Sequence, residues 1–264
     1  MASTTPLRVQ AQTFRLPEAV TAEVRQKLSD WDAAGGTRRL FAGDASLWTG
    51  ADEASWLGWL TIVEEQIADL ARLKSIREEA GREGFRYALL LGMGGSSLCP
   101  EVWKETFGTV PGCPELFVLD STDPAQVKAV EQRIDIAGTL FLVASKSGST
   151  LEPNIFKAYF FDRVREAVGA AEAGSRFVAI TDPGSSLEKE AGVDGFRHVF
   201  SGVKSIGGRY SALSNFGMVP AAVMGLDVER LLGEAARMKA ACAPGVPAAE
   251  NPGLVLGTIL GVLG

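Results

Sequence analysis

The chain has 264 residues, 46% hydrophobic and 22% charged, and can bury a substantial core as one large or two smaller domains. Its net charge of −6 excludes a general basic surface for a nucleic-acid backbone or an anionic membrane. Three widely spaced cysteines without a CxxC pair argue against a disulfide framework and a zinc site, and no apolar run approaches the roughly 20 residues needed to span a membrane. We therefore expect a globular cytoplasmic protein that binds no nucleic acid, membrane or metal.

The first part of the chain is predicted to be helical. Residues 17–34 fit a helix that ends at the pair Gly35-Gly36. Apolar residues then recur at spacings of three and four, with charged residues between them, which predicts an amphipathic helix packed on the core. This apolar stripe consists of Trp56, Trp59, Leu60, Val63, Ile67 and Leu70. We therefore assign residues 1–84 to a helical N-terminal arm.

Beyond Gly84 the pattern changes to short apolar runs, separated by segments long enough for crossover helices. This alternation predicts an α/β fold with a doubly wound, five-stranded parallel sheet of order 2-1-3-4-5, covered by helices on both faces. The expected strands are Tyr87–Leu91, Leu116–Leu119, Leu140–Ala144, Phe177–Ile180 and Phe196–Phe200. Asp123-Pro124 and Asp182-Pro183-Gly184 are expected to open the second and fourth helices, since aspartate caps a helix and proline suits its first turn.

Two loops rich in glycine and hydroxyl side chains follow the first and third expected strands. They are Gly92-Met93-Gly94-Gly95-Ser96-Ser97 and Ser145-Lys146-Ser147-Gly148-Ser149-Thr150. Glycine lets the backbone approach an anion closely, while hydroxyls and the amides of the following helix donate hydrogen bonds to it. The first and third strands are neighbours at the topological switch point, so both loops face one crevice. Together they predict a site for a compact dianion such as a phosphomonoester, whereas either loop alone is better explained as an ordinary tight turn.

Other motif interpretations explain less of the chain. Gly92-Met93-Gly94 resembles the start of a dinucleotide fingerprint, and Asp120 lies where a ribose-binding acid would be, but Ser97 replaces the third glycine and the hydroxyl-rich loop stays unexplained. No Walker-type loop is present. The single histidine, His198, lies in an apolar run and is better interpreted as structural than as the base of a serine hydrolase or a metal ligand.

A third motif, Gly207-Gly208-Arg209-Tyr210-Ser211, follows the fifth expected strand. Paired glycines allow close backbone approach and the arginine supplies a permanent cation, the alternative being a surface turn with a solvated arginine. In order and spacing, the three loops resemble the motifs of glucose-6-phosphate isomerases over about residues 86–226. They are most similar to the isomerase part of bacterial transaldolase/glucose-6-phosphate isomerase fusions, which also have serine-rich first and second loops.

This resemblance implies a sugar-isomerase (SIS) domain over residues 85–226 that binds a sugar phosphate and uses no cofactor. It implies that the phosphate is held by Gly95, Ser96, Ser145, Lys146, Ser147 and Thr150, with Gly94 and Gly208 lining the substrate. Arg209 would stabilise the enediolate formed as a proton moves between C2 and C1. Glu152 matches an acidic residue near the sugar. The common family loop has Thr and Phe where this chain has Ser147 and Gly148, which keeps the hydroxyl.

The family's general base and ring-opening residues lie further toward the C-terminus than this chain extends. Asn251-Pro252 opens a last helix that meets no stop signal before Gly264, so residues 227–264 are expected to connect to a missing C-terminal portion. The resemblance also suggests a homodimer or pairing with a second SIS domain. We therefore expect isomerisation of glucose 6-phosphate and fructose 6-phosphate. A non-catalytic sugar-phosphate sensor and a dinucleotide-dependent oxidoreductase are the alternatives, neither of which explains Gly208-Arg209 as well.

Overall fold

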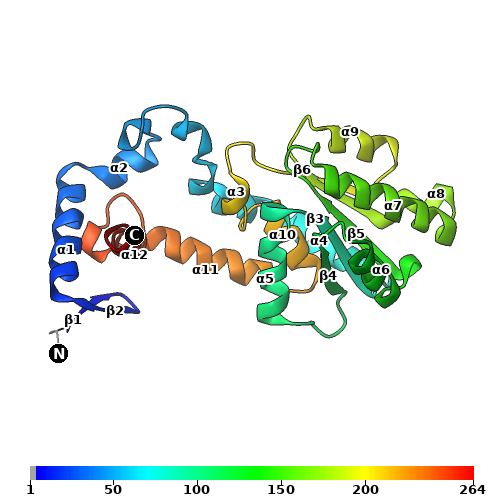
Figure 1. The fold of residues 1–264 in the computed structure, drawn as a ribbon, viewed down its shortest axis with the longest axis horizontal. Coiled ribbons are helices and arrows are strands. Elements are labelled where there is room, and N and C mark those ends of the chain that lie inside the picture. The colour runs from blue at the N-terminus through cyan, green and yellow to red at the C-terminus, as the bar shows by residue number, and fades with distance from the viewer. Residues whose placement is uncertain (1–3) are drawn as a thin grey trace. The chain divides into compact units, whose positions relative to one another are not determined.

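The computed structural model describes residues 4–264, which form two compact units. The larger unit is Gly58–Leu232, and the smaller joins the chain up to Leu57 with Gly233–Gly264 (Figure 1). This division does not follow the predicted boundaries at residues 84 and 226. The reason is helix α4 (Leu70–Arg82), which was assigned to the arm but buries its apolar face in the same core as the sheet.

A five-stranded parallel sheet forms the centre of the larger unit. Its strands are β3 (Tyr87–Gly92), β4 (Glu115–Leu119), β5 (Thr139–Ala144), β6 (Phe177–Thr181) and β7 (His198–Ser201). They pair in the order β4-β3-β5-β6-β7, which confirms the predicted sheet. Gly92, the last residue of β3, lies opposite Ala144, the last residue of β5. The loops that follow these two strands therefore begin side by side at the carboxyl edge of the sheet.

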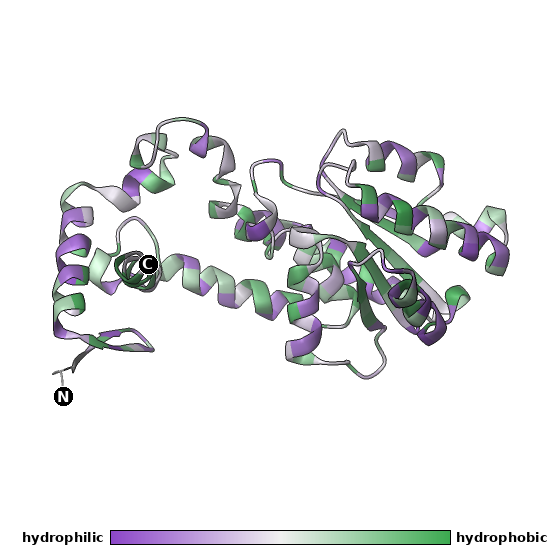
Figure 2. Cartoon of the chain, in the orientation of Figure 1, coloured by the Kyte–Doolittle hydropathy of each residue, from purple (hydrophilic) through white to green (hydrophobic). Residues whose placement is uncertain are grey.

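Helices cover both faces of this sheet. One face packs against α4, α5 (Leu98–Phe107) and α10 (Asn215–Val223), and the other against α6 (Pro124–Arg133), α7 (Leu151–Val168) and α9 (Ser186–Val193). Because both faces are covered, the strands are apolar on both sides, as their green colour in Figure 2 shows, and all six residues of β5 are buried. Shorter elements of this unit are α8 (Ala170–Ala173), η4 (Gly94–Ser96), η5 (Ile136–Gly138), η6 (Gly174–Arg176) and η7 (Gly208–Tyr210).

The predicted amphipathic helix over residues 56–70 is wrong. The chain forms the 3₁₀ turns η2 (Glu53–Trp56) and η3 (Gly58–Leu60), then α3 (Ile62–Ala68), and of the predicted stripe Val63 alone is buried. Gly58 N–H donates to Ser205 O at 3.0 Å, and a Cβ on Gly58 would overlap the Ser205 side chain. This close approach of two backbone segments replaces the helical hydrogen bonds that the spacing of apolar residues predicted.

The smaller unit begins with an antiparallel hairpin, so the prediction of a wholly helical arm is also wrong. Strands β1 (Thr4–Val9) and β2 (Gln12–Pro17) are joined by a turn in which Gln10 has a positive φ of 52°. The other elements are α1 (Glu18–Ala33), α2 (Gly36–Phe41), η1 (Ala45–Leu47), η2, most of α11 (Val228–Ala241), η8 (Ala248–Glu250) and α12 (Pro252–Leu263). Helix α1 confirms the predicted helix over residues 17–34.

A separate apolar core holds the smaller unit together. It consists of Val9, Leu16, Val24, Leu28, Ala248, Val255 and Ile259, contributed by the hairpin, α1, η8 and α12. Asn251 caps α12 as predicted, because its Oδ1 accepts a hydrogen bond of 3.0 Å from Leu254 N–H. No helix within residues 4–264 has both the length and the apolar character of a bilayer-spanning segment.

Asp123 caps α6, as the sequence predicts, and offers a test of how much the cap contributes. Its Oδ1 accepts hydrogen bonds from Ala125 N–H at 2.8 Å and Gln126 N–H at 3.1 Å. We expect Asp123→Ala to lower the free energy of unfolding by about 1 kcal/mol, because two amides lose their acceptor. Urea unfolding followed by circular dichroism measures this change. Asp123→Asn keeps the acceptor oxygen and is the control; an asparagine variant as unstable as the alanine variant would contradict the cap.

Candidate active site

Three loops meet at the carboxyl edge of the sheet, and we name them by their composition. The glycine loop is residues 92–97, the serine loop is residues 145–150 and the arginine loop is residues 207–211. The glycine and arginine loops touch through their backbones: a Cβ on Gly95 would lie 2.5 Å from the carbonyl carbon of Gly208 and 2.7 Å from its Cα. Ser211 Oγ donates to Gly208 O at 2.7 Å and lies 3.3 Å from Gly95 O. The structure therefore brings Gly95 and Gly208 into contact and leaves no room for a side chain on Gly95.

The glycine loop folds back over the ends of two strands. Gly94 has a φ of +53°, and a Cβ on Gly92 would lie 3.2 Å from Ser96 O and 3.3 Å from Ala144 O. Ser97 is fully buried and donates from Oγ to Gly94 O at 3.1 Å. The hydroxyl of Ser96 is partly exposed and has no hydrogen-bond partner among the residues described, so it is free to donate to a ligand.

The serine loop leads from β5 into α7 and presents several hydroxyls. Ser145 is 1% exposed, and its Oγ has no hydrogen-bond partner in the described part of the chain. Ser147 Oγ and Ser149 Oγ lie 2.9 Å apart. Thr150 precedes the first turn of α7, an 18-residue helix, and its side chain caps none of the helix amides. Those amides carry the positive end of the helix dipole and remain available to an anion.

Helix α9 holds the serine loop in place. Gly148 has a φ of +72°, and a Cβ there would lie 2.8 Å from the backbone nitrogen of Leu187. Ser186 Oγ donates to Gly148 O at 2.7 Å, and Asn154 Nδ2 donates to the same carbonyl at 3.2 Å. Glycine is thus required at this position, because the loop lies directly against the start of α9.

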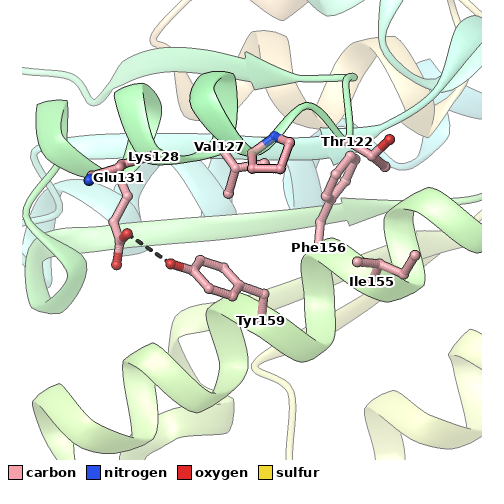
Figure 3. Close-up of a pocket in the computed structure, with 8 residues that line it drawn as sticks. Thr122, Val127, Lys128, Glu131, Ile155, Phe156 and Tyr159 are labelled. Atoms are coloured by element: carbon pink, nitrogen blue, oxygen red, sulfur yellow. Dashed lines mark hydrogen bonds between the residues drawn. The ribbon is translucent and has the colours of Figure 1, made fainter.

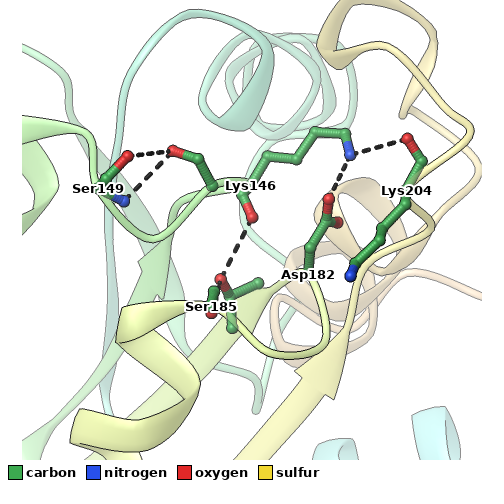
Figure 4. A network of polar contacts seen from close by, with 7 residues as sticks. Lys146, Ser149, Asp182, Ser185 and Lys204 are labelled. Carbon is green, nitrogen blue, oxygen red and sulfur yellow. Dashed lines mark hydrogen bonds and ion pairs between the residues drawn. The ribbon is translucent and has the colours of Figure 1, made fainter.

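Lys146 points away from the hydroxyls of its own loop. Its ammonium group forms an ion pair with Asp182 and donates to Lys204 O at 3.2 Å, whereas Ser149 lies on the other side of the loop (Figure 4).

The prediction that Asp182 opens a helix is wrong. Ser185 caps α9 instead, accepting from Glu188 N–H at 3.1 Å.

The two residues predicted to be catalytic, Arg209 and Glu152, lie in η7 and at the start of α7, at the carboxyl edge of the sheet. Arg209 is exposed in η7, beside Gly208, and Glu152 is half-buried in the first turn of α7. Neither side chain forms a hydrogen bond or ion pair within residues 4–264. The structure therefore gathers the predicted residues on the three loops and the first turn of α7, but it shows no contact of Arg209 or Glu152 with another of them.

His198 lies at the opposite edge of the sheet, at the start of β7. Its Nε2 is 2.7 Å from Glu79 Oε2 on α4. Burial raises the pKa of Glu79, but hydrogen bonds from His198 and Ser75 and the charges of His198 and Arg197 outweigh this and leave the pKa lowered. The partner of His198 is thus a carboxylate remote from the three loops, in agreement with the structural role predicted for it.

A cavity of about 490 Å³ lies between α6 and α7 and is distinct from the three loops (Figure 3). It is lined by Thr122, Pro124, Val127, Lys128, Glu131, Ile155, Phe156 and Tyr159. Tyr159 OH donates to Glu131 Oε2 at 2.8 Å, and this hydrogen bond raises the pKa of Tyr159. None of the predicted site residues lines this cavity.

No cluster of His, Cys, Asp and Glu side chains within the described residues could hold a metal ion.

Comparison with known proteins decides the family. The model of the phosphoglucose isomerase family matches residues 69–262, nearly three quarters of the chain. This chain belongs to the phosphoglucose isomerase family. A glucose-6-phosphate isomerase of Trichormus variabilis is 37% identical over 163 residues, 58% of this chain and 29% of that protein. One of Synechococcus sp. is 36% identical over 184 residues, 67% of this chain and 33% of that protein.

Solved structures of longer proteins share the fold of this phosphoglucose isomerase family member. A hypothetical protein of Thermus thermophilus matches with a TM-score of 0.78 and 27% identity, over 92% of this chain and 56% of that one. A glucose-6-phosphate isomerase of Chlamydia trachomatis matches with a TM-score of 0.64 and 27% identity, over 85% of this chain and 41% of that one. The chain spans about a third of the length of the curated relatives it matches. The predicted transaldolase fusion stays a prediction.

The backbone contact between the glycine and arginine loops predicts the effect of a single methyl group. We expect Gly95→Ala to lower the free energy of unfolding by about 1–3 kcal/mol, because the new Cβ overlaps the backbone of Gly208 and forces the loops apart. Urea unfolding measures the change. Gly207→Ala is the matched control, since its Cβ would meet only Tyr210 Cδ2 at 3.6 Å and its φ of −64° suits any residue. Equal losses in both variants would contradict the contact.

Cys99 follows the glycine loop, and its reactivity reports on burial there. Burial raises the pKa of this thiol from 9.0 to about 11, because the thiolate would lose hydration. At pH 8 we expect Cys99 to react with iodoacetamide on the order of 100-fold more slowly in the folded chain than in urea, since thiolate is the reacting form. Peptide mass spectrometry follows the modification. Similar rates in both states, or a folded-state rate that reaches its plateau below pH 10, would argue against a buried thiol.

Proposed function

We propose that this chain provides the phosphate site and a charge-stabilising arginine of a glucose-6-phosphate isomerase. Such an enzyme interconverts glucose 6-phosphate and fructose 6-phosphate by moving a proton between C2 and C1 through an enediolate. The observation that carries this proposal is the meeting of the glycine, serine and arginine loops at one edge of the sheet, where Gly95 contacts Gly208. The names of the matched relatives support the choice of substrate.

The phosphate group is held by neutral donors at the start of α7. Ser145, Ser147 and Thr150 supply hydroxyls from the serine loop, and Ser96 supplies one from the glycine loop. Two observations support this role: Ser145 Oγ lacks a partner although it is buried, and the amides of the α7 first turn have no side-chain cap. Buried donors and acceptors without partners are costly, and a bound phosphate would satisfy the Ser145 hydroxyl. The charge of Lys146 is paired with Asp182.

The reacting carbons of the sugar lie near Gly94, Gly95 and Gly208, where the absence of side chains leaves the backbone accessible. Arg209 stabilises the enediolate, because a permanent cation beside the developing negative charge lowers the energy of the transition state. Glu152 lies beside the sugar, in the place that the family resemblance gives it. The reaction transfers hydrogen within one molecule, so it requires no redox cofactor.

The same family assignment supports a setting and an assembly for the protein. We place it in the cytoplasm, where its three cysteines, free in this structure, would stay reduced. We also propose that it works as a homodimer or paired with a second SIS domain.

Binding of fructose 6-phosphate to the 264-residue chain tests the proposed function. We expect calorimetry to detect binding, and the double variant Ser147→Ala, Thr150→Ala to weaken it by about 100-fold or more, since each of the two lost hydrogen bonds to a charged group is worth about 1.5–3 kcal/mol. Ser175→Ala is the control, because this serine precedes β6 at the opposite sheet edge and donates only to Glu172 O.

The titration also separates the alternatives. Fructose without the phosphate is expected not to bind, because the site is assigned to the phosphate group. Unchanged affinity in the double variant would refute the assignment of the serine loop. Binding of NAD that fructose 6-phosphate does not displace would instead favour a dinucleotide-dependent oxidoreductase.

A further inference from the structure

We propose that Lys146 links the serine loop to the segment that enters the arginine loop, and that Asp182 is the positioning residue that holds Lys146 there. Lys146 would then act on the bound sugar phosphate through the placement of these loops, and not as a direct ligand of the phosphate. This inference rests on the proposed function for its binding measurement, and on geometry for the rest.

The first observation is the direction of the Lys146 side chain. Its ammonium group pairs with Asp182 Oδ2 and donates to Lys204 O at 3.2 Å, on the side of the loop opposite Ser149 (Figure 4). The backbone of Lys146 is fixed to β6 as well, because Asp182 N–H donates to Lys146 O at 3.0 Å. One residue therefore joins the ends of β5 and β6 and the chain that follows β7.

The second observation is the burial of the carboxylate. Asp182 is 8% exposed, and its Oδ1 has no hydrogen-bond partner within the described residues. The carboxylate lies against the backbone at Gly202, where a Cβ would overlap Oδ1. A buried carboxylate is stable only with a compensating charge, and Lys146 supplies that charge. Breaking the pair would therefore leave a buried carboxylate without a compensating charge.

The third observation is the path of the chain from Lys204 to the arginine. The Lys204 carbonyl is held by Lys146, and the next carbonyl, of Ser205, accepts from Gly58 N–H at 3.0 Å. Ile206 is 1% exposed, and Gly207 then begins the arginine loop. The segment that enters this loop is therefore fixed at three consecutive residues, the first of them through Lys146.

A direct ligand and a link make opposite predictions for substitutions at the two positions. If Lys146 contacted the phosphate, Asp182→Asn would free its ammonium group and tighten binding, and Lys146→Met would weaken binding with or without Asp182. If Lys146 is a link held by Asp182, Asp182→Asn weakens binding. Lys146→Met then matters only while Asp182 is present, because the link is already lost in the Asp182→Asn background.

The experiment is a double-mutant cycle on the full 264-residue chain, with fructose 6-phosphate titrated by calorimetry. In the natural background we expect Lys146→Met to weaken binding tenfold or more. In the Asp182→Asn background the same substitution should weaken binding by less than about threefold. Asp182→Asn alone is also expected to weaken binding. Tighter binding by Asp182→Asn, or the same loss from Lys146→Met in both backgrounds, would overturn the inference. If Lys146→Met alone does not fold, the comparison of Asp182→Asn with the double variant still decides, because neither contains the unpaired carboxylate.

A second readout keeps the inference separate from the proposed function. In amide NMR spectra, Asp182→Asn is expected to shift the signals of residues 203–209, whereas Ser175→Ala should leave them in place. The urea midpoint of unfolding should likewise fall in Lys146→Met when Asp182 is present. It should change little when Asp182 is already replaced by asparagine. If the natural chain binds no fructose 6-phosphate, the proposed function fails and these two measurements still test the link. If amide signals of residues 203–209 do not move, the link itself is refuted.

Discussion

The candidate site depends on the parallel pairing of β3 with β5, in which Gly92 lies opposite Ala144. This register ends both strands at the same level, so the glycine and serine loops start side by side and the start of α7 faces the same edge. The arginine loop follows the parallel strand β7 and so lies at the same edge, and it can contact the glycine loop because Gly95 has no side chain. A side chain on Gly95 would keep the arginine away.

The charge available to a ligand at the three loops depends on which of their two cations is already paired. The chain is acidic overall, and the lysine of the serine loop is paired with a buried carboxylate. The groups free to meet a phosphate are therefore hydroxyls and helix amides, while Arg209 remains the unpaired cation of the three loops within the described residues. Under the proposed function, neutral donors would bind the phosphate, whose charge does not change during the reaction. The free cation would lie near the reacting carbons, where charge develops.

Predictions from the local sequence are confirmed where the structure depends on contacts between residues close together in the chain. The strand order, the cap at Asp123 and the cap at Asn251 follow from apolar runs and side chains that act within one or two turns. The helix over residues 56–70 failed because Gly58 binds Ser205 across a sequence separation that periodicity does not detect. The hairpin over residues 4–17 was missed because its alternation of apolar and polar residues is short. Asp182 was predicted to cap a helix because Pro183 follows it, but its side chain pairs with Lys146 instead.

The sequence by itself determined the class of the fold, the identity of the three loops and the edge of the sheet at which two of them meet, because strand order in a doubly wound sheet places its loops. Only the tertiary structure decided that the glycine and arginine loops touch and that Lys146 forms an ion pair with Asp182. It also decided that the hairpin and α1 share a core with α12. The physical reason is that each of these features is a contact between residues distant in sequence. Their distances and burial are set by packing, and no local pattern encodes them.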